Sequence, residues 1–374
     1  MRIAILYGGK SAEHEVSLRS VTSVLKNIDY AKHSVYLIGI TKTGRWYVQD
    51  ESALKKILQG SEELLTIEES PAHAVSVIPG SGTEGGLYCK AVSLCVDIVL
   101  PILHGTYGED GLLQGLLEMA ELPYCGCTVM SSAVAMDKEK AKLIWQSKNL
   151  PVVPFMCIKA SQNEKNESEK IFCEAESEFG YPVFVKPACA GSSVGSAKAN
   201  NKAELQTAVN NAFLWDETVL IEPFIESREI ECSVTGNSGE SLKSDCPVTA
   251  YELGEIAPTH EFYDYDAKYT DPKGANLIIP AQLDAEQCNT IKNLAKKAYS
   301  ALDCSGFARV DFFLDKKSSK IYINELNTLP GFTSISMFVK MCEASGLAYS
   351  DVIELLLKQG LSRFKSRRML LTSI

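Results

Sequence analysis

The sequence predicts an α/β fold that opens with a doubly wound parallel-sheet domain and continues into α+β regions. Residues 2–9 (RIAILYGG) have the composition of a buried strand that ends in two glycines. A helical stretch (VSLRSVTSVLKNI) and a second strand (SVYLIGIT) come next. A strand, a glycine turn, a helix and a strand make a βαβ unit, which implies a parallel sheet with a helical crossover.

The later elements follow in order along the chain. Residues 50–90 are polar and rich in turn residues, which predicts an insertion at the edge of the sheet, and 96–105 (VDIVLPILHG) predicts a further buried strand. The segment 131–155 is helical and then interrupted by prolines, which indicates a hinge. We expect three parts, at 1–129, 130–226 and 227–374.

Composition and charge limit the classes of function. The chain has 374 residues with 45% apolar side chains, enough to bury a sizeable core. The 37 basic and 47 acidic residues give a net charge of −10, which argues against a nucleic-acid partner and against an anionic membrane surface.

Cysteine usage and the apolar runs indicate a compartment. The 12 cysteines are scattered without a CxxC pair, which fits reduced thiols packed as small apolar groups. The apolar run after Met1 is too short for a signal peptide, and the run AVSLCVDIVLPIL is interrupted by Asp97 and too short to span a bilayer. We therefore expect a soluble, cytoplasmic protein.

Acidic side chains lie in a predicted hairpin at 307–327 (FARVDFFLDKKSSKIYINELN). Asp311 can face Glu325 across the two strands, and Asn327 lies two residues after Glu325, on the same face. Carboxylate and amide oxygens are ligands that Mg²⁺ accepts, together with water and phosphate. A solvated sheet face is the alternative, but Arg309 on the face of Asp311 and the LPG that follows Asn327 favour a site.

A small-residue loop could bind phosphate. In VKPACAGSSVGSAK, Lys186 ends a strand and is followed by a glycine- and serine-rich loop whose backbone N–H groups and hydroxyls can approach an anion. The loop alone is weak evidence, since turns often have this composition. Lys138 is a second candidate phosphate contact, with a solvated helix lysine as its alternative.

Other polar groups stand where strands end. Glu222 and Glu229 in LIEPFIESRE could receive a base and a ribose, although solvated acids on an edge strand explain them equally well. Two loops, GGKSAEHEVSL with Glu13, His14 and Glu15, and HGTYGEDG, follow strands of the first sheet. Ligands of doubly wound sheets bind at such carboxyl ends, so we expect a small polar substrate there.

Seven motifs occur in this order along the chain: GGKSAEHEVSL, HGTYGEDG, AMDK, KPACAGSSVG, EFYDYDAKY, GFARVDFF and NELNTLPGFTSIS. Together they resemble one family, the D-alanine–D-alanine ligases of the ATP-grasp superfamily. The resemblance extends from Arg2 to about residue 358. It implies an N-terminal α/β domain and two subdomains that hold ATP between them. It also implies ligation of two D-alanines through D-alanyl phosphate, for peptidoglycan precursors.

The resemblance also implies roles for single residues. Glu15 would bind the ammonium of the first D-alanine and form a hydrogen-bonded set with Ser192 and Tyr269, and His104 would flank this substrate. Arg309 and the Gly331 N–H would form the oxyanion hole, and Ser336 and Met337 would line the pocket for the second substrate. Two Mg²⁺ or Mn²⁺ ions would be held by Asp311, Glu325 and Asn327. ATP would be bound by Lys138, Lys186, Ser193, Glu222, Ile225, Glu229, Lys268 and Phe313. Many relatives are homodimers.

The loop 254–277 is expected to close over the site. It has no clean period and contains several tyrosines, and long loops inside compact domains are usually functional. Because acyl phosphates hydrolyse in water, a lid that carries Lys268 and Tyr269 inward fits the implied chemistry.

Two positions differ from the usual family pattern. Ile335 stands in TSIS where a histidine is common, and Pro223, which has no N–H, follows Glu222. Tyr269 and the apolar Met337 favour D-alanine as the second substrate over D-lactate and D-serine, although the motif frame also resembles D-alanine–D-serine ligases of the glycopeptide-resistance type.

Rival functions fit the sequence less well. A catalytically silent nucleotide-binding paralogue should have lost part of the acidic set or Arg309, and none is missing. An ATP-grasp carboxylase would need a partner domain for which no chain length remains. Gly8-Gly9 lacks the third glycine of a dinucleotide-binding fingerprint.

Overall fold

The computed structural model describes residues 1–60, 64–164, 167–239, 246–258 and 275–371. Lys268 and Tyr269, and most of the expected lid, lie outside the described residues. Within them, no helix combines the length and the apolar character needed to cross a membrane.

The first sheet confirms the predicted βαβ unit. Its strand order is β3-β2-β1-β7, and β1 pairs in parallel with both β2 and β7. Helix α1 connects β1 to β2, and the short β3 adds an antiparallel edge. The bounds are β1 (Arg2–Gly8), α1 (His14–Asn27), β2 (Ser34–Ile40), β3 (Trp46–Val48) and β7 (Ile98–Ile102).

The predicted edge insertion forms a small unit of its own. It contains a three-stranded antiparallel sheet, β4-β5-β6, beside the edge strand β3. An isolated β-bridge between Tyr47 of β3 and Ala74 connects the two sheets. Its elements are α2 (Glu51–Leu58), η1 (Pro71–His73), β4 (Val75–Val77), α3 (Gly82–Gly85), β5 (Leu87–Cys89) and β6 (Val92–Ser93).

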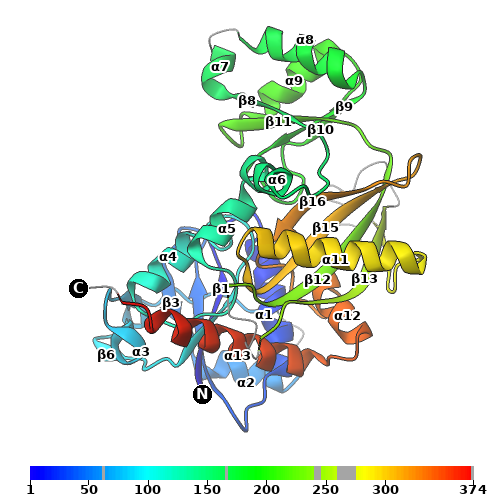
Figure 1. The fold of residues 1–374 in the computed structure, drawn as a ribbon. Helices are drawn as coiled ribbons and strands as arrows, with labels where there is room; N and C mark the ends of the chain where they lie inside the picture. The colour runs from blue at the N-terminus through cyan, green and yellow to red at the C-terminus, as the bar shows by residue number, and fades with distance from the viewer. Residues whose placement is uncertain (61–63, 165–166, 240–245, 259–274, 372–374) are drawn as a thin grey trace.

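The middle of the chain forms a separate antiparallel sheet with helices on one face, at the top of Figure 1. Its strand order is β10-β9-β11-β8, and helices α4, α5 and α6 lead to it from the first sheet. The bounds are α4 (Leu112–Met119), α5 (Val129–Met136), α6 (Lys138–Ser147), β8 (Met156–Lys159), α7 (Ala160–Glu164), α8 (Ser168–Phe179), β9 (Val183–Pro187), β10 (Ala197–Ala199), α9 (Lys202–Ala212) and β11 (Thr218–Pro223).

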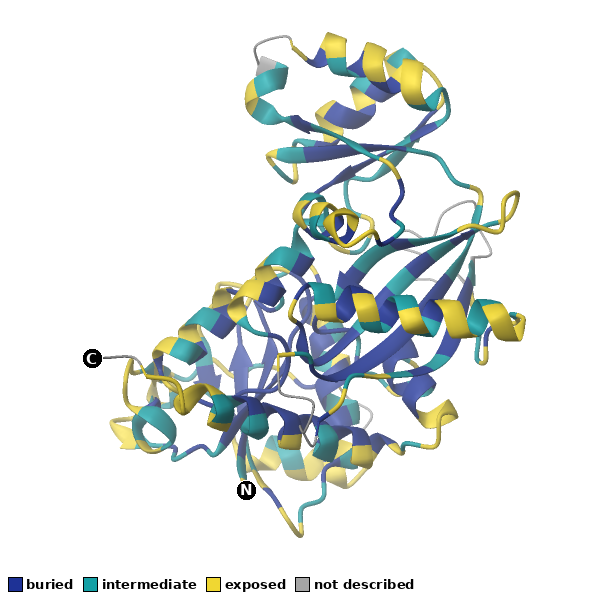
Figure 2. Cartoon of the chain, in the orientation of Figure 1, coloured by how far each residue is buried: buried dark blue, intermediate teal, exposed yellow. Residues whose placement is uncertain are grey.

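The third sheet contains the predicted hairpin. Its order is β14-β13-β12-β15-β16, and α11 covers one face (Figure 1). The central strands β12 and β15 of this sheet are mostly buried, whereas the outer face of α11 is exposed (Figure 2). The bounds are β12 (Ser227–Asn237), β13 (Thr249–Pro258), β14 (Ala275–Ile278), α11 (Ala285–Ala301), β15 (Ser305–Asp315), β16 (Ile321–Asn327) and α12 (Met337–Ala344).

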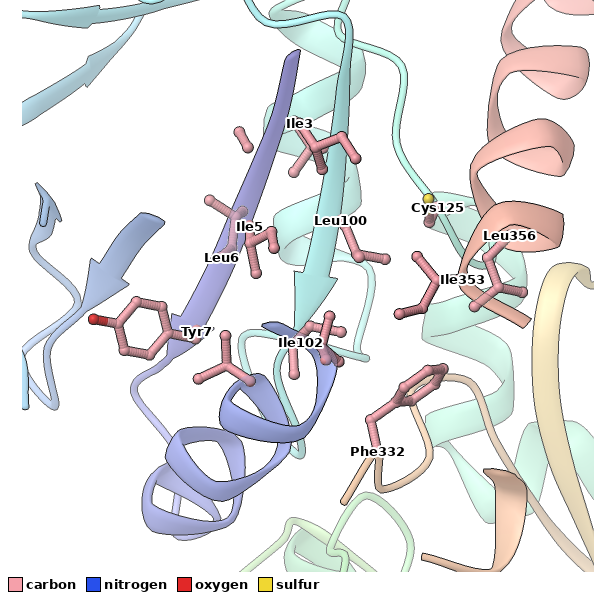
Figure 3. Close-up of a cluster of buried hydrophobic side chains, with 14 of the residues drawn as sticks. Ile3, Ile5, Leu6, Tyr7, Leu100, Ile102, Cys125, Phe332, Ile353 and Leu356 are labelled. Atoms are coloured by element: carbon pink, nitrogen blue, oxygen red, sulfur yellow. The ribbon is translucent and has the colours of Figure 1, made fainter. Parts of the chain in front are cut away.

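The C-terminal helix α13 (Tyr349–Arg368) returns to the first sheet. Ile353 and Leu356 pack into the same core as Leu100 and Ile102 of β7, with Phe332 beside them (Figure 3). The last part of the chain therefore completes the core of the first, which sequence periodicity alone does not predict. The division into three parts at 129 and 226 stays a prediction.

A buried arginine fixes this helix in place. The Arg363 guanidinium donates to the carbonyls of Gly126 and Tyr124 and to the Ser305 hydroxyl, and it lies over the Tyr124 ring at 4.2 Å from the centroid. It thus connects α13, the segment after the first sheet, and β15.

Replacing Arg363 by methionine should lower the free energy of unfolding by about 2–5 kcal/mol. Methionine keeps part of the packing but leaves the buried acceptors without a donor, at about 1–3 kcal/mol for each such group. Urea denaturation measures the loss. Arg367→Met, one turn later, removes only an exposed ion pair with Glu118 and should cost less than about 1 kcal/mol. Equal losses in the two variants would contradict the anchoring role.

Candidate active site

One large cleft collects the predicted site residues. It has a volume of about 1310 Å³ and is lined by residues of the middle sheet, the third sheet and the loops that follow β1 and β7. Every predicted residue in the described part of the chain lines it, with one exception. Those residues are His104, Lys138, Lys186, Ser192, Ser193, Glu222, Ile225, Glu229, Arg309, Asp311, Phe313, Glu325, Asn327, Gly331, Ser336 and Met337.

The hairpin places its polar residues opposite one another. Asp311 of β15 pairs with Glu325 of β16, and Arg309 pairs with Asn327. The Arg309 guanidinium donates two hydrogen bonds of 2.7 Å to the Asp311 carboxylate, and Asn327 Nδ2 donates another at 2.9 Å. Burial acts against the Arg309 charge, but Asp311 and Glu231 raise its pKa well above the usual value. The cation is therefore permanent.

These residues fit a divalent cation. Asp311 and Glu325 present two carboxylates on one face, with the Asn327 amide beside them, and oxygen donors of this kind suit Mg²⁺. In the described part of the chain, no three His, Cys, Asp or Glu side chains are grouped to hold a metal by themselves. The remaining ligands would therefore come from phosphate and water, as is usual for Mg²⁺.

The glycine- and serine-rich loop contacts the loop that follows β1. Ser192 and Ser193 both adopt positive φ angles, 52° and 58°, a region that non-glycine residues rarely occupy. Ser192 Oγ donates a 2.5 Å hydrogen bond to Glu13 Oε1, and Lys138 Nζ donates at 2.7 Å to the Ala190 carbonyl. The strained loop thus bridges the loop after β1 and the N-terminus of α6, which fits a functional position.

The expectation that Glu15 joins Ser192 is wrong. The Glu15 side chain is 53% exposed and forms an ion pair with Lys42 at 2.5 Å, which lowers its pKa. Glu13, which is 9% exposed, lines the cleft instead. Glu13 immediately precedes α1, whereas Glu15 lies in the first turn, so the helix rotates the two side chains to different directions.

A buried histidine and a partly buried glutamate interact with the charge of Glu13. His104 Nδ1 donates to the Leu329 carbonyl at 2.9 Å, and its Nε2 lies 2.9 Å from Ser20 Oγ. Burial lowers the pKa of His104, so the ring is neutral. Glu109 accepts from the Gly105 and Leu329 N–H groups, yet burial and the charge of Glu13 raise its pKa to about 8. HGTYGEDG thus supplies two uncharged groups at neutral pH.

The raised pKa of Glu109 predicts a pH dependence of stability. The folded chain binds more protons than the unfolded chain between the ordinary value of 4.5 and about 8. This contribution is therefore complete below pH 4.5 and is lost as pH rises through 8, with a slope of at most about 1.4 kcal/mol per pH unit. Melting temperatures from pH 5 to pH 8 should fall more steeply in the wild type than in Glu109→Gln. Parallel curves would contradict the assignment.

A buried ion triad lies at the other end of the cleft. Glu222, which is 2% exposed, forms ion pairs with Lys186 Nζ at 2.9 Å and Lys142 Nζ at 2.5 Å. Burial favours the neutral acid, but the two lysines hold the pKa of Glu222 below its usual value. Lys142 is not among the predicted site residues, although its spacing of four residues from Lys138 places both on one face of α6.

Comparisons with known proteins identify the family. A family model described as "D-ala D-ala ligase N-terminus" matches residues 2–127, and one described as "D-ala D-ala ligase C-terminus" matches 144–358. The chain is 51% identical over 373 residues to a D-alanine–D-alanine ligase of Treponema denticola, covering 100% of this chain and 99% of the relative. The chain belongs to the D-alanine–D-alanine ligase family. It is accordingly an enzyme of the ATP-dependent ligase type.

Further similarities agree with the family and confirm the predicted fold class. A D-alanine–D-alanine ligase of Acetivibrio thermocellus is 45% identical, covering 97% of this chain and 96% of the relative. The solved D-alanine–D-alanine ligase from Coxiella burnetii aligns with a TM-score of 0.82 and 32% identity, covering 99% of this chain and 97% of that one. The VanG D-Ala:D-Ser ligase from Enterococcus faecalis aligns at 0.81 and 35%, covering 96% and 99%.

In this ligase-family chain, the loop after β16 forms the wall beside Arg309. Gly331 lies close to Ser336, since a Cβ on Gly331 would stand 2.8 Å from Ser336 Oγ. Ser336 Oγ accepts from the Thr333 N–H at 3.0 Å. Met337 is buried in a cluster with Ile256 and Met341, while the neighbouring Ile335 is 66% exposed. Met337 thus supports the pocket wall more than it projects from it.

The two strands that flank the expected lid are paired. β13 and β14 form an antiparallel ladder in which Glu255 pairs with Ile278. Ile256 and Leu277 of these strands line the cleft. The expected lid between them, of which residues 259–274 lie outside the described part of the chain, stays a prediction.

Proposed function

We propose that the chain joins two D-alanines into D-alanyl-D-alanine and converts ATP to ADP and phosphate, through a D-alanyl phosphate intermediate. The observation that carries the proposal is the convergence of two chemically distinct ends on one cleft. Glu13 and Ser192 lie at one end, and Lys186 and Glu222 lie at the other. Arg309 and the paired carboxylates Asp311 and Glu325 line the same cleft.

The nucleotide occupies the end between the middle and third sheets. Lys138 and Lys186 neutralise phosphate charge, Glu222 accepts from the base, and Glu229 accepts from the ribose. Ser193 contacts phosphate, and Ile225 and Phe313 contact the nucleotide. Phosphoryl transfer depends mainly on positioning and on neutralising charge, which this set supplies.

The first D-alanine binds beside the first sheet. The Glu13 carboxylate pairs with its ammonium, and the neutral His104 flanks it without adding repulsion. The carboxylate of this substrate then attacks the γ-phosphate and displaces ADP, and the free amine of the second D-alanine attacks the resulting acyl phosphate and displaces inorganic phosphate. Arg309 and the Gly331 N–H stabilise the tetrahedral oxyanion, and fixed donors of this kind typically contribute about 10²–10³ in rate.

Asp311, Glu325 and Asn327 would hold two Mg²⁺ or Mn²⁺ ions, which would neutralise phosphate charge during transfer. Asp311 also orients Arg309, because its carboxylate accepts two hydrogen bonds from the guanidinium. Metal and oxyanion sites thus share one carboxylate.

D-Alanine is the proposed second substrate. Ser336 and Met337 line its pocket, and an apolar wall suits a methyl side chain. The similarity to the VanG D-Ala:D-Ser ligase makes D-serine the second candidate. A homodimer in the cytoplasm, where ATP and D-alanine are available for peptidoglycan precursor synthesis, completes the proposal.

The test is phosphate release from ATP and Mg²⁺ with D-alanine alone, and then with D-serine or D-lactate added, followed by mass analysis of the products. D-Alanyl-D-alanine as the main product is expected. If a mixed product dominated, D-serine or D-lactate would be the second substrate in place of D-alanine. The absence of phosphate release with all three compounds would refute the ligase assignment.

A further inference from the structure

Lys142 is a charged side chain that the proposed mechanism does not use. It is 0% exposed, donates to the Val153 carbonyl at 3.3 Å and lies 2.5 Å from Glu222 Oε1. Glu222 and Lys186 line the cleft, whereas Lys142 does not. The buried lysine therefore stands behind Glu222 and cannot contact a bound nucleotide.

The chemistry of Glu222 depends on its protonation state. An ionised carboxylate only accepts hydrogen bonds, whereas a protonated one can also donate. The 6-amino group of adenine is a donor, and the 6-keto group of hypoxanthine or guanine is an acceptor. An ionised Glu222 therefore favours the aminopurine and repels the ketopurine. A buried carboxylate stays ionised only if cations compensate for its burial.

The two residues after Glu222 offer no backbone N–H group for hydrogen bonding to a base. Pro223 has no N–H, and the Phe224 N–H already donates to the Pro182 carbonyl at 3.1 Å. Neither Pro223 nor Phe224 therefore has an N–H available to donate to a base. Base recognition at this point of the cleft depends correspondingly more on the Glu222 carboxylate.

We propose that Lys142 is a positioning residue for nucleotide selection, which keeps Glu222 ionised and fixed so that the cleft accepts an aminopurine and rejects a ketopurine. This rests on the proposed function, in which ATP occupies the cleft. Lys138 and Lys142 lie about 6 Å apart along α6, so one helix face positions groups at both the phosphate and the base. Lys186 alone does not replace Lys142, because it also bonds Asn324 Oδ1 at 3.1 Å.

The experiment compares ATP with inosine triphosphate (ITP), which differs at the 6-position. In Lys142→Met we expect KM for ATP to rise about tenfold, kcat to stay within about threefold, and the preference for ATP over ITP to fall about tenfold. Lys140→Met, on the exposed side of the same helix, is the control and should behave as the wild type.

A second variant separates positioning from general destabilisation. If Lys142 acts through Glu222, adding Lys142→Met to Glu222→Gln should not change the ATP-to-ITP ratio by more than about twofold. The double variant removes the Glu222 and Lys142 charges together, so it avoids an unpaired carboxylate, and Lys186 keeps its hydrogen bond to Asn324. Lys142→Gln, which can still donate to Val153, serves where Lys142→Met does not fold.

Calorimetric binding of ATP and ITP to the wild type and the variants gives the same comparison without turnover, so a failure of the ligase assignment would not obscure it. An unchanged ATP-to-ITP ratio in the Lys142 variants, or a loss confined to kcat, would overturn the proposal.

Discussion

Replacing Asp311 by asparagine, or Glu325 by glutamine, should reduce phosphate release at least about 10³-fold while the chain remains folded. Each variant removes one of two opposed carboxylates, and charge stabilisation by a bound metal contributes several kcal/mol to such a reaction. Asp311→Asn should lose more, because the Asp311 carboxylate also holds Arg309 through two hydrogen bonds.

Metal affinity provides a readout that does not depend on turnover. Binding of Mn²⁺ in the presence of ADP, followed by electron paramagnetic resonance, should weaken in both variants. Asp315→Asn is the matched control, because Asp315 lies at the far end of β15 and its carboxylate accepts from Lys317 N and Ser318 Oγ within its own turn. Normal turnover in Asp311→Asn or Glu325→Gln would eliminate the metal assignment.

Replacing Glu13 by glutamine should lower kcat/KM for D-alanine by about 10- to 100-fold. Glutamine can still accept from Ser192 but loses the charge, and a hydrogen bond to a charged group contributes about 1.5–3 kcal/mol. The KM for ATP should change little, since Glu13 lies at the other end of the cleft from Glu222.

The neighbouring Glu15 provides the control for this experiment. Glu15→Gln removes only an exposed ion pair with Lys42, so its steady-state parameters should stay within about twofold of the wild type. If Glu15→Gln were the damaging change and Glu13→Gln the silent one, the placement of the ammonium site would be reversed.

The local features of the fold could be predicted from sequence because short-range rules determine them. Glycines after a buried run and a 3.6-residue period define the first βαβ unit, and alternation defines the hairpin. The opposition of Asp311 and Glu325 then follows from two strands and a short turn, and the paired strands confirm it.

Other features depend on the direction in which a side chain points or on contacts between residues far apart in the sequence. A local sequence pattern contains neither kind of information. Glu13 and Glu15 both follow β1, and only the start of α1 decides which one faces Ser192. Lys142 resembles a solvated helix lysine until Glu222, eighty residues later in the chain, is placed against it. The raised pKa of Glu109 likewise arises from burial in the folded chain and from the charge of Glu13, ninety-six residues earlier.

The position of α13 has a consequence for synthesis on the ribosome. The last strand of the first sheet ends at Ile102, but the helix that completes its core begins only at Tyr349. N-terminal domains commonly fold first during translation. Here the core of the first sheet stays incomplete, with an apolar face exposed, until almost the whole chain has been synthesised. Truncation before Tyr349 would therefore produce an aggregation-prone fragment rather than a smaller folded domain.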